Sequence, residues 1–148
     1  MNSRSRARGH RIMTQETGKA IGDMISLLWA RSFEDYLSSS AFIRYLLDHD
    51  LCDEWRKYLE LGRDNSALYG SSVWKFAFTR FMEHLHHHLP ERFLFLFSRL
   101  LADFSHGLSC DLPVDEIRSS LIRMGYPAEK IDPALVVLKV KQVPVPED

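Results

Sequence analysis

The sequence has little cysteine, and its two cysteines do not belong to a recognisable pairing pattern. Cys52 and Cys110 stand far apart in a chain of 148 residues. Disulfide frameworks and zinc-binding motifs need more cysteines at close and regular spacings. We therefore expect a reduced protein of the cytoplasm that holds no cofactor.

The sequence also lacks an excess of one charge and a long apolar run. Its 19 Lys and Arg residues against 20 Asp and Glu residues give a formal net charge of −1, whereas a nucleic-acid-binding domain is usually clearly basic. No stretch approaches the roughly 20 apolar residues that cross a bilayer, and the N-terminal segment has no apolar signal-peptide core. Neither nucleic acid nor a membrane is therefore an expected partner.

Signatures of catalysis are missing as well. The sequence contains no glycine-rich phosphate loop, no Ser-His-Asp order and no cysteine nucleophile motif. Its paired carboxylates, Asp53-Glu54 and Asp115-Glu116, stand at the starts of expected helices, where the helix dipole accounts for them. These absences favour a protein that works by contact rather than by chemistry.

Large aromatic side chains are concentrated in residues 73–104, which hold seven of the nine phenylalanines. Apolar positions in this stretch recur at three- and four-residue steps, which predicts two adjacent amphipathic helices. Pro90 is expected to begin the second helix, because proline is tolerated at a first helical position. The residues predicted to be buried together are Phe78, Phe81, Phe93, Phe97, Leu100, Leu101 and Phe104.

The same helical period continues through most of the chain and predicts an all-α fold, a compact bundle of about six or seven helices. Ser38–Ser40 supply hydroxyls that can cap one helix, and Asp53 can cap the next. Gly62 and Gly125 suit the C-terminal ends of two helices. The expected single domain covers residues 14–135.

The two ends of the chain differ from this domain. Residues 1–13 carry four arginines and no acidic residue, and we expect them to form a disordered basic tail. Residues 136–148 begin with an alternating apolar run and contain Pro144 and Pro146, which predicts a strand-like or extended tail.

The segment Glu116–Leu135 (EIRSSLIRMGYPAEKIDPAL) resembles the first two helices of a ubiquitin-associated domain, which a Met-Gly-aromatic loop joins. Met124, Gly125 and Tyr126 stand in that loop here. The resemblance covers about twenty residues and implies two packed helices. The third helix of such a domain has no expected counterpart from Lys139 onward, so we do not carry ubiquitin binding over to this chain.

Four histidines, His84, His86, His87 and His88, stand at the end of the first aromatic helix. His84 and His88 are four residues apart, so on a helix they point the same way and are the candidates for a metal site. A third ligand would have to come from elsewhere in the chain. We favour an exposed helix end, where the dipole stabilises positive charge, over a metal site.

Arg80 is followed by His86 and His87, either of which could pair with it, and Arg44 is followed at a similar spacing by His49. This pattern is similar to that of the helical HEPN ribonucleases, in which an Arg and a His on one helix hold the scissile phosphate and transfer protons. The resemblance implies a metal-independent ribonuclease of a toxin or defence system, with Arg80 and His86 as the catalytic pair. We keep this function as the alternative interpretation.

The interpretation that we favour is a non-catalytic helical module for protein–protein interaction, or an accessory module, that binds a protein partner or associates with itself. Large apolar residues exceed what a bundle of this size must bury, and aromatic side chains are frequent at protein interfaces. The candidate contact residues are Trp74, Tyr69 and Tyr58.

Overall fold

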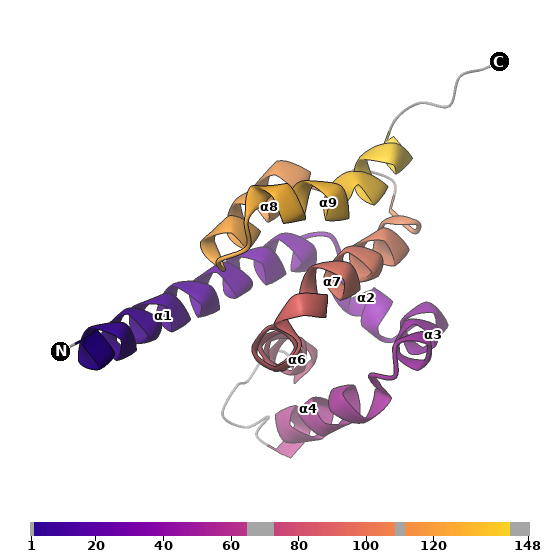
Figure 1. The fold of residues 1–148 in the computed structure, drawn as a ribbon. Coiled ribbons are helices and arrows are strands. Elements are labelled where there is room, and N and C mark those ends of the chain that lie inside the picture. The colour runs from indigo at the N-terminus through magenta and orange to yellow at the C-terminus, as the bar shows by residue number, and fades with distance from the viewer. Residues whose placement is uncertain (1, 65–72, 109–111, 143–148) are drawn as a thin grey trace.

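The computed structural model describes the backbone of residues 2–64, 73–108 and 112–142 and the side chains of 15–64, 73–108 and 112–138. Every regular element in these ranges is a helix (Figure 1), which confirms the predicted all-α fold. None of these helices combines the length and the apolar character of a bilayer-spanning segment. The helices are α1 (Asn2–Trp29), α2 (Phe33–Leu37), α3 (Ser40–Asp48), α4 (Cys52–Asp64), α6 (Val73–His88), α7 (Pro90–Ser105), α8 (Val114–Arg123) and α9 (Ala128–Gln142).

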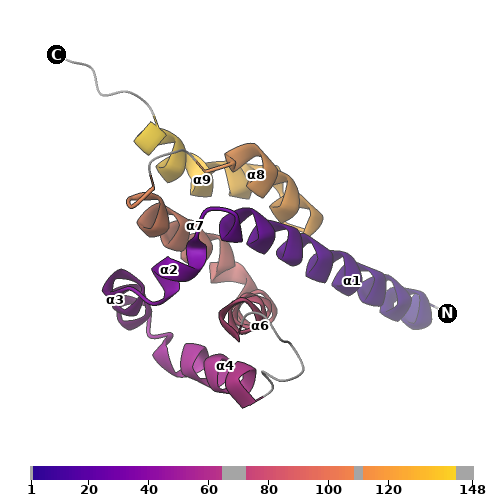
Figure 2. The same ribbon diagram turned by 180° about the vertical axis from the view of Figure 1, so that it is seen from behind.

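Helix α6 lies at the centre of the fold, where it contacts α1, α2, α4 and α7. Helix α4 packs against α6 on one side, while α8 and α9 cover α1 and α7 on the other (Figures 1 and 2). In both views the N-terminal part of α1 extends beyond the other helices.

The core is aromatic, and the seven residues predicted to be buried together are all buried, each with at most 5% of its surface exposed. Phe93 and Phe97 stack with their ring centroids 5.5 Å apart. Phe33 of α2 connects the two long aromatic helices, because its ring lies 4.8 Å from that of Phe78 and 4.7 Å from that of Phe104.

Three local signals in the sequence correctly mark where helices begin and end. Ser39 caps α3, since its Oγ accepts a hydrogen bond from the backbone nitrogen of Phe42 at 3.3 Å. Pro90 is the first residue of α7. Gly125 follows α8 with a φ angle of 105°, a left-handed conformation that glycine adopts without the usual steric cost.

The predicted boundaries of α4 are wrong. The helix begins at Cys52 and ends at Asp64, so Asp53 lies in its first turn and Gly62 lies inside the helix. The reason is the neighbouring helix α6: a Cβ atom added at Gly62 would lie only 3.1 Å from the carbonyl oxygen of Val73. Gly62 therefore permits the close approach of α4 and α6 instead of ending a helix.

The C-terminal part of α9 corrects a second prediction. The segment from residue 136, expected to be strand-like or extended, is helical as far as Gln142. Ile131, Leu135 and Leu138 are buried on a helix that packs against α7 and α8. This burial outweighs the β propensity of the valines at 136 and 137, because strand propensity depends strongly on context. Residues 143–148 lie outside the described residues.

The N-terminal segment also differs from its prediction. Helix α1 begins at Asn2, so its first turns pass through the segment 2–13 that composition predicts to be a disordered tail. The segment contains no proline that would stop a helix, and arginine and alanine are good helix formers. The short segment Phe33–Leu37 forms a helix of its own, which brings the described helices to eight instead of six or seven.

Candidate functional site

Arg80 and His86, the catalytic pair of the alternative interpretation, have separate surroundings on α6. Arg80 is exposed, and its Nη1 lies 2.9 Å from Oε1 of Glu83. His86 is half-buried, and its Nδ1 lies 2.7 Å from the hydroxyl of Tyr126. Within the described part of the chain, the two side chains have no common partner.

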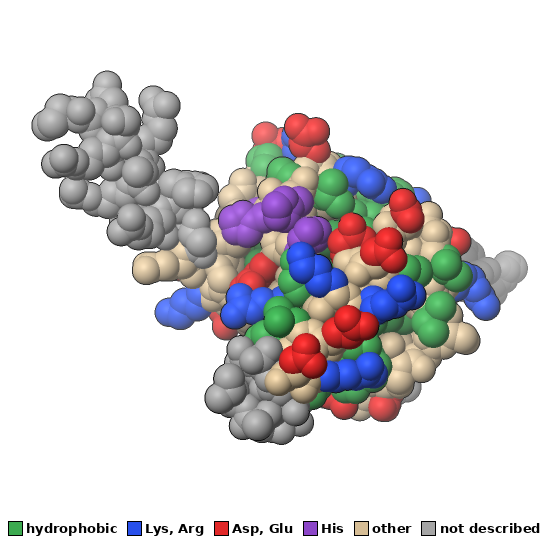
Figure 3. Space-filling view, turned by 90° about the horizontal axis from the view of Figure 1, so that it is seen from below, with side chains coloured by type: hydrophobic (Ala, Val, Ile, Leu, Met, Phe, Trp, Pro, Cys, Tyr) green, Lys and Arg blue, Asp and Glu red, His purple; other side chains and the backbone are tan. Residues whose placement is uncertain are grey.

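The histidines at the end of α6 connect this helix to its neighbours. Nδ1 of His84 lies 3.0 Å from the hydroxyl of Tyr58 on α4, whereas His86 contacts Tyr126 in the α8–α9 loop. Burial lowers the pKa of both imidazoles. The nearby His88 lowers the pKa of His84 further, and the nearby His87 lowers that of His86. Figure 3 shows the histidines as one surface patch.

The lowered pKa of His86 predicts a pH-dependent stability. The unfolded chain binds a proton at His86 at a higher pH than the folded chain does, so the free energy of unfolding should rise with pH. We expect this contribution to be complete above about pH 6.5 and to be lost as the pH falls below it. Chemical denaturation of the wild type and of His86→Gln at several pH values measures the slope, which should be smaller in the variant.

The exposed His106 offers a control for this experiment, because His106→Gln also removes one imidazole. A slope that is the same in the wild type and in His86→Gln would contradict the prediction.

Among the residues that the structure describes, the candidate metal pair of His84 and His88 does not gain a third ligand. The rings of His84 and His88 lie 4.5 Å apart. Among the described residues, no group of three or more His, Cys, Asp or Glu side chains could hold a metal ion.

Two of the aromatic contact candidates, Trp74 and Tyr58, are described by the structure and are only partly exposed. Trp74 is half-buried, with its ring 6.1 Å from that of Trp55. Tyr58 is half-buried and packs against the core, and its hydroxyl is engaged with His84. Tyr69 lies outside the described residues.

Two adjoining pockets lie where α2 and α3 face α7. They share Ala41 and Asp103, and we call the pair the Asp103 groove. The small pocket has a volume of about 180 Å³ and is also lined by Arg44, Tyr45, Asp48, His49 and Arg99. The large pocket has a volume of about 530 Å³, and its lining includes Arg31, Ser32, Tyr36, Phe104, His106 and Leu108.

Asp103 stands between the two pockets and is held by a buried tyrosine. The hydroxyl of Tyr36 donates a hydrogen bond to Oδ2 of Asp103 at 2.5 Å. Burial, and then this carboxylate, raise the pKa of Tyr36 far above its usual value, so the hydroxyl remains a donor at neutral pH. A second buried hydroxyl, that of Tyr45, donates to the carbonyl oxygen of Leu96 at 2.6 Å and fixes α3 against α7.

The small pocket brings together two arginines and one histidine. Arg44 and Arg99 form no ion pair with a described residue, although the guanidinium of Arg99 lies 5.2 Å from the ring centroid of Phe95. Burial lowers the pKa of His49, Asp48 raises it, and the charges of Arg92 and Arg99 lower it again. The pocket thus offers guanidinium groups to an anion beside an imidazole that tends to stay neutral.

The large pocket contains a strained residue and an unpaired donor. Ser32 has φ and ψ angles of 61° and 38°, a left-handed conformation that is uncommon for residues other than glycine. Arg31 donates from Nη1 to the carbonyl oxygen of Leu27 at 2.9 Å, but its buried Nε has no partner among the described residues. Backbone strain of this kind is frequent at ligand-binding sites.

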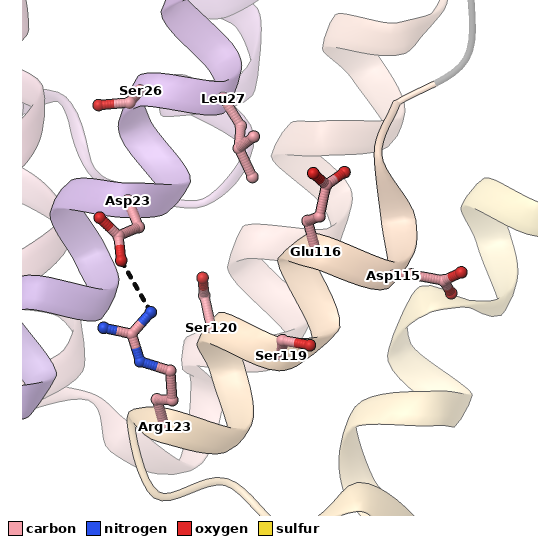
Figure 4. A pocket seen from close by; sticks show the side chains of 8 residues that line it. All are labelled: Asp23, Ser26, Leu27, Asp115, Glu116, Ser119, Ser120 and Arg123. Atoms are coloured by element: carbon pink, nitrogen blue, oxygen red, sulfur yellow. Dashed lines mark hydrogen bonds and ion pairs between the residues drawn. The ribbon is translucent and has the colours of Figure 1, made fainter.

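A further hollow, of about 510 Å³, lies between α1 and α8. Figure 4 shows Arg123 of α8 reaching Asp23 of α1, at 2.7 Å. Arg123 also binds Glu16 at 2.7 Å, so the cation of this hollow is already neutralised. We place the candidate site in the Asp103 groove instead.

Sequence reasoning identified only part of this groove. Arg44 and His49 attract notice by their spacing, whereas Arg31, Arg99 and Asp103 do not. Arg99 and Asp103 are four residues apart and lie on the same side of α7. This polar pair is a signal in the sequence that could have indicated the site.

A comparison of the chain with protein-family models, with curated proteins and with solved structures finds no match. Helices α8 and α9 do form the two-helix unit that the resemblance to ubiquitin-associated domains implies, with Gly125 in the loop between them. No family match supports a relationship to those domains, so this unit adds nothing to the functional assignment.

Proposed function

We propose that the chain is a non-catalytic helical interaction module of the cytoplasm that binds a partner protein through the Asp103 groove. The observation that supports this proposal is the pair of adjoining pockets with Arg44 and Arg99 at one end. Pockets that take a small ligand group are typically concave and mostly apolar, with a few polar groups that fix orientation. Arginine is enriched among the residues that dominate protein interfaces. Self-association through the same groove is one form of this function.

The proposal is tested by site-specific photo-cross-linking in cells that produce the protein. A photoreactive amino acid in place of the exposed Asp48 would stand at the rim of the small pocket. We expect a covalent adduct with a partner protein or with a second copy of the chain. The same amino acid in place of the exposed Glu129, on α9, should give no such adduct. The absence of an adduct at both positions would contradict the proposed function. Formation of the same adduct at both positions would contradict it as well.

A second candidate function is metal-independent RNA cleavage. One observation favours it, with Arg44 and His49 as the pair in place of Arg80 and His86. Arg44 and His49 line the same small pocket, whereas Arg80 and His86 engage different neighbours. An arginine and an imidazole near a bound phosphodiester could hold the phosphate and transfer a proton.

RNA cleavage assays separate the two functions. Under the interaction function, we expect the wild-type protein to leave RNA intact in the presence of a metal chelator. Cleavage that is lost in Arg44→Ala and in His49→Ala, but kept in Arg80→Ala, would overturn our choice and assign the reaction to the small pocket. Cleavage that is lost in Arg80→Ala and His86→Ala would assign it to α6.

A further inference from the structure

The small pocket contains cationic groups that form no ion pair within the described part of the chain. Arg44 and Arg99 line it, and neither forms an ion pair with a described residue. Arg92 adds positive charge nearby, since it acts on both Tyr45 and His49. A guanidinium group binds a carboxylate through two parallel N–H donors. These residues therefore fit an anionic group on the ligand.

The same pocket also carries negative charge, which restricts the kind of ligand. Asp48 and Asp103 lie in its wall. Carboxylates accept hydrogen bonds but cannot donate them, so the ligand must also supply donors beside its anionic group. Asp103 is fixed through one oxygen by Tyr36, so it is oriented to accept a further hydrogen bond. A peptide supplies both partners, because it has backbone N–H donors and can carry an acidic side chain.

The large pocket adjoins this site and suits an apolar side chain. Its wall includes the rings of Tyr36 and Phe104 and the side chain of Leu108. Because the two pockets share Ala41 and Asp103, an apolar residue and an acidic residue close together in one segment can occupy both.

We propose that the Asp103 groove binds an acidic peptide segment of the partner protein, with a Glu or Asp carboxylate held by Arg44 and Arg99 and a neighbouring apolar side chain in the large pocket. This inference rests on the proposed function and names the chemistry of its partner.

Fluorescence anisotropy with labelled peptides tests the inference directly. The probes are short peptides of Gly and Ser that carry one Glu and one Leu at varied separations, with Gln or Ala replacing either residue as matched controls. We expect one separation to bind best and binding to weaken as salt increases. The Glu-to-Gln change should weaken binding about tenfold or more, as expected for the loss of charge-assisted hydrogen bonds.

Variants of the protein locate the binding site. We expect Arg44→Ala and Arg99→Ala each to weaken binding about tenfold. Arg99→Lys should restore only part of the affinity that Arg99→Ala loses, because lysine lacks the guanidinium fork. Arg56→Ala, which removes an exposed arginine of α4, is the control and should bind as the wild type does. Far-UV circular dichroism verifies that each variant is folded.

Three results would overturn the inference. One is equal binding of the Glu and Gln peptides, and another is tighter binding of a phosphoserine peptide than of the Glu peptide. The third is a cross-linked partner whose contact segment at Asp48 has no acidic residue, in which case the proposed function stands and its partner chemistry is wrong. Failure of both the cross-linking and the peptide binding would overturn the two proposals together.

Discussion

Replacement of Phe97 by alanine should reduce the free energy of unfolding by about 3–5 kcal/mol, a large part of the stability of a typical domain. Phe97 is 2% exposed, and its ring stacks on Phe93 at 5.5 Å. The substitution removes this contact and leaves a cavity between rigid helices. Urea denaturation followed by circular dichroism measures the change.

Phe95 provides a matched control on the same helix. Its side chain is 47% exposed, so Phe95→Ala removes the same atoms from a site that faces the solvent. We expect a loss below about 1 kcal/mol, because surface substitutions usually have small effects. Equal losses for the two variants would show that α7 does not face the core as described.

A methyl group at Gly62 should also destabilise the fold, although alanine is the better helix former. The added Cβ atom would lie 3.1 Å from the carbonyl oxygen of Val73 and 3.2 Å from a ring carbon of Phe76. Overpacking typically costs about 1–3 kcal/mol, and the gain in helix propensity offsets about 1 kcal/mol. We expect Gly62→Ala to lower the free energy of unfolding by up to about 2 kcal/mol.

Gly22 on α1 is the control, because a Cβ atom there would have no neighbour within 4 Å. Gly22→Ala should raise the free energy of unfolding by about 0.5–1 kcal/mol through helix propensity alone. Thermal melts of the two variants should therefore shift in opposite directions. A stabilising Gly62→Ala would show that α4 and α6 are less closely packed than described.

The core could be predicted from the sequence because burial in a helix follows a simple period. Phe93, Phe97 and Phe104 are spaced so that they lie on one face of α7, and all three are buried. Pro90 and Gly125 mark helix boundaries through their own backbone restrictions, which do not depend on neighbours. The strand-like or extended segment predicted from residue 136 is instead helical to Gln142, because the propensity of valine does not include the helices against which α9 packs.

The groove could not be predicted, because it depends on how distant segments meet. Arg31, Arg44 and Asp103 come from three separate parts of the chain, and their proximity results from the packing of α2 and α3 against α7. The Arg44–His49 spacing was visible in the sequence, but so was that of Arg80 and His86. The structure distinguishes the two pairs, because Arg80 contacts Glu83 whereas His86 contacts Tyr126.

The distribution of tryptophan determines what an optical experiment on this protein would detect. The indole rings of Trp29 and Trp55 lie 6.1 Å and 6.5 Å from the ring of Phe78, and Trp74 lies 6.1 Å from Trp55. All three tryptophans of the chain therefore report on the surroundings of α6, whereas α8 and α9 contain none. Unfolding of α8 and α9 alone would reduce helical ellipticity while leaving most of the tryptophan emission unchanged.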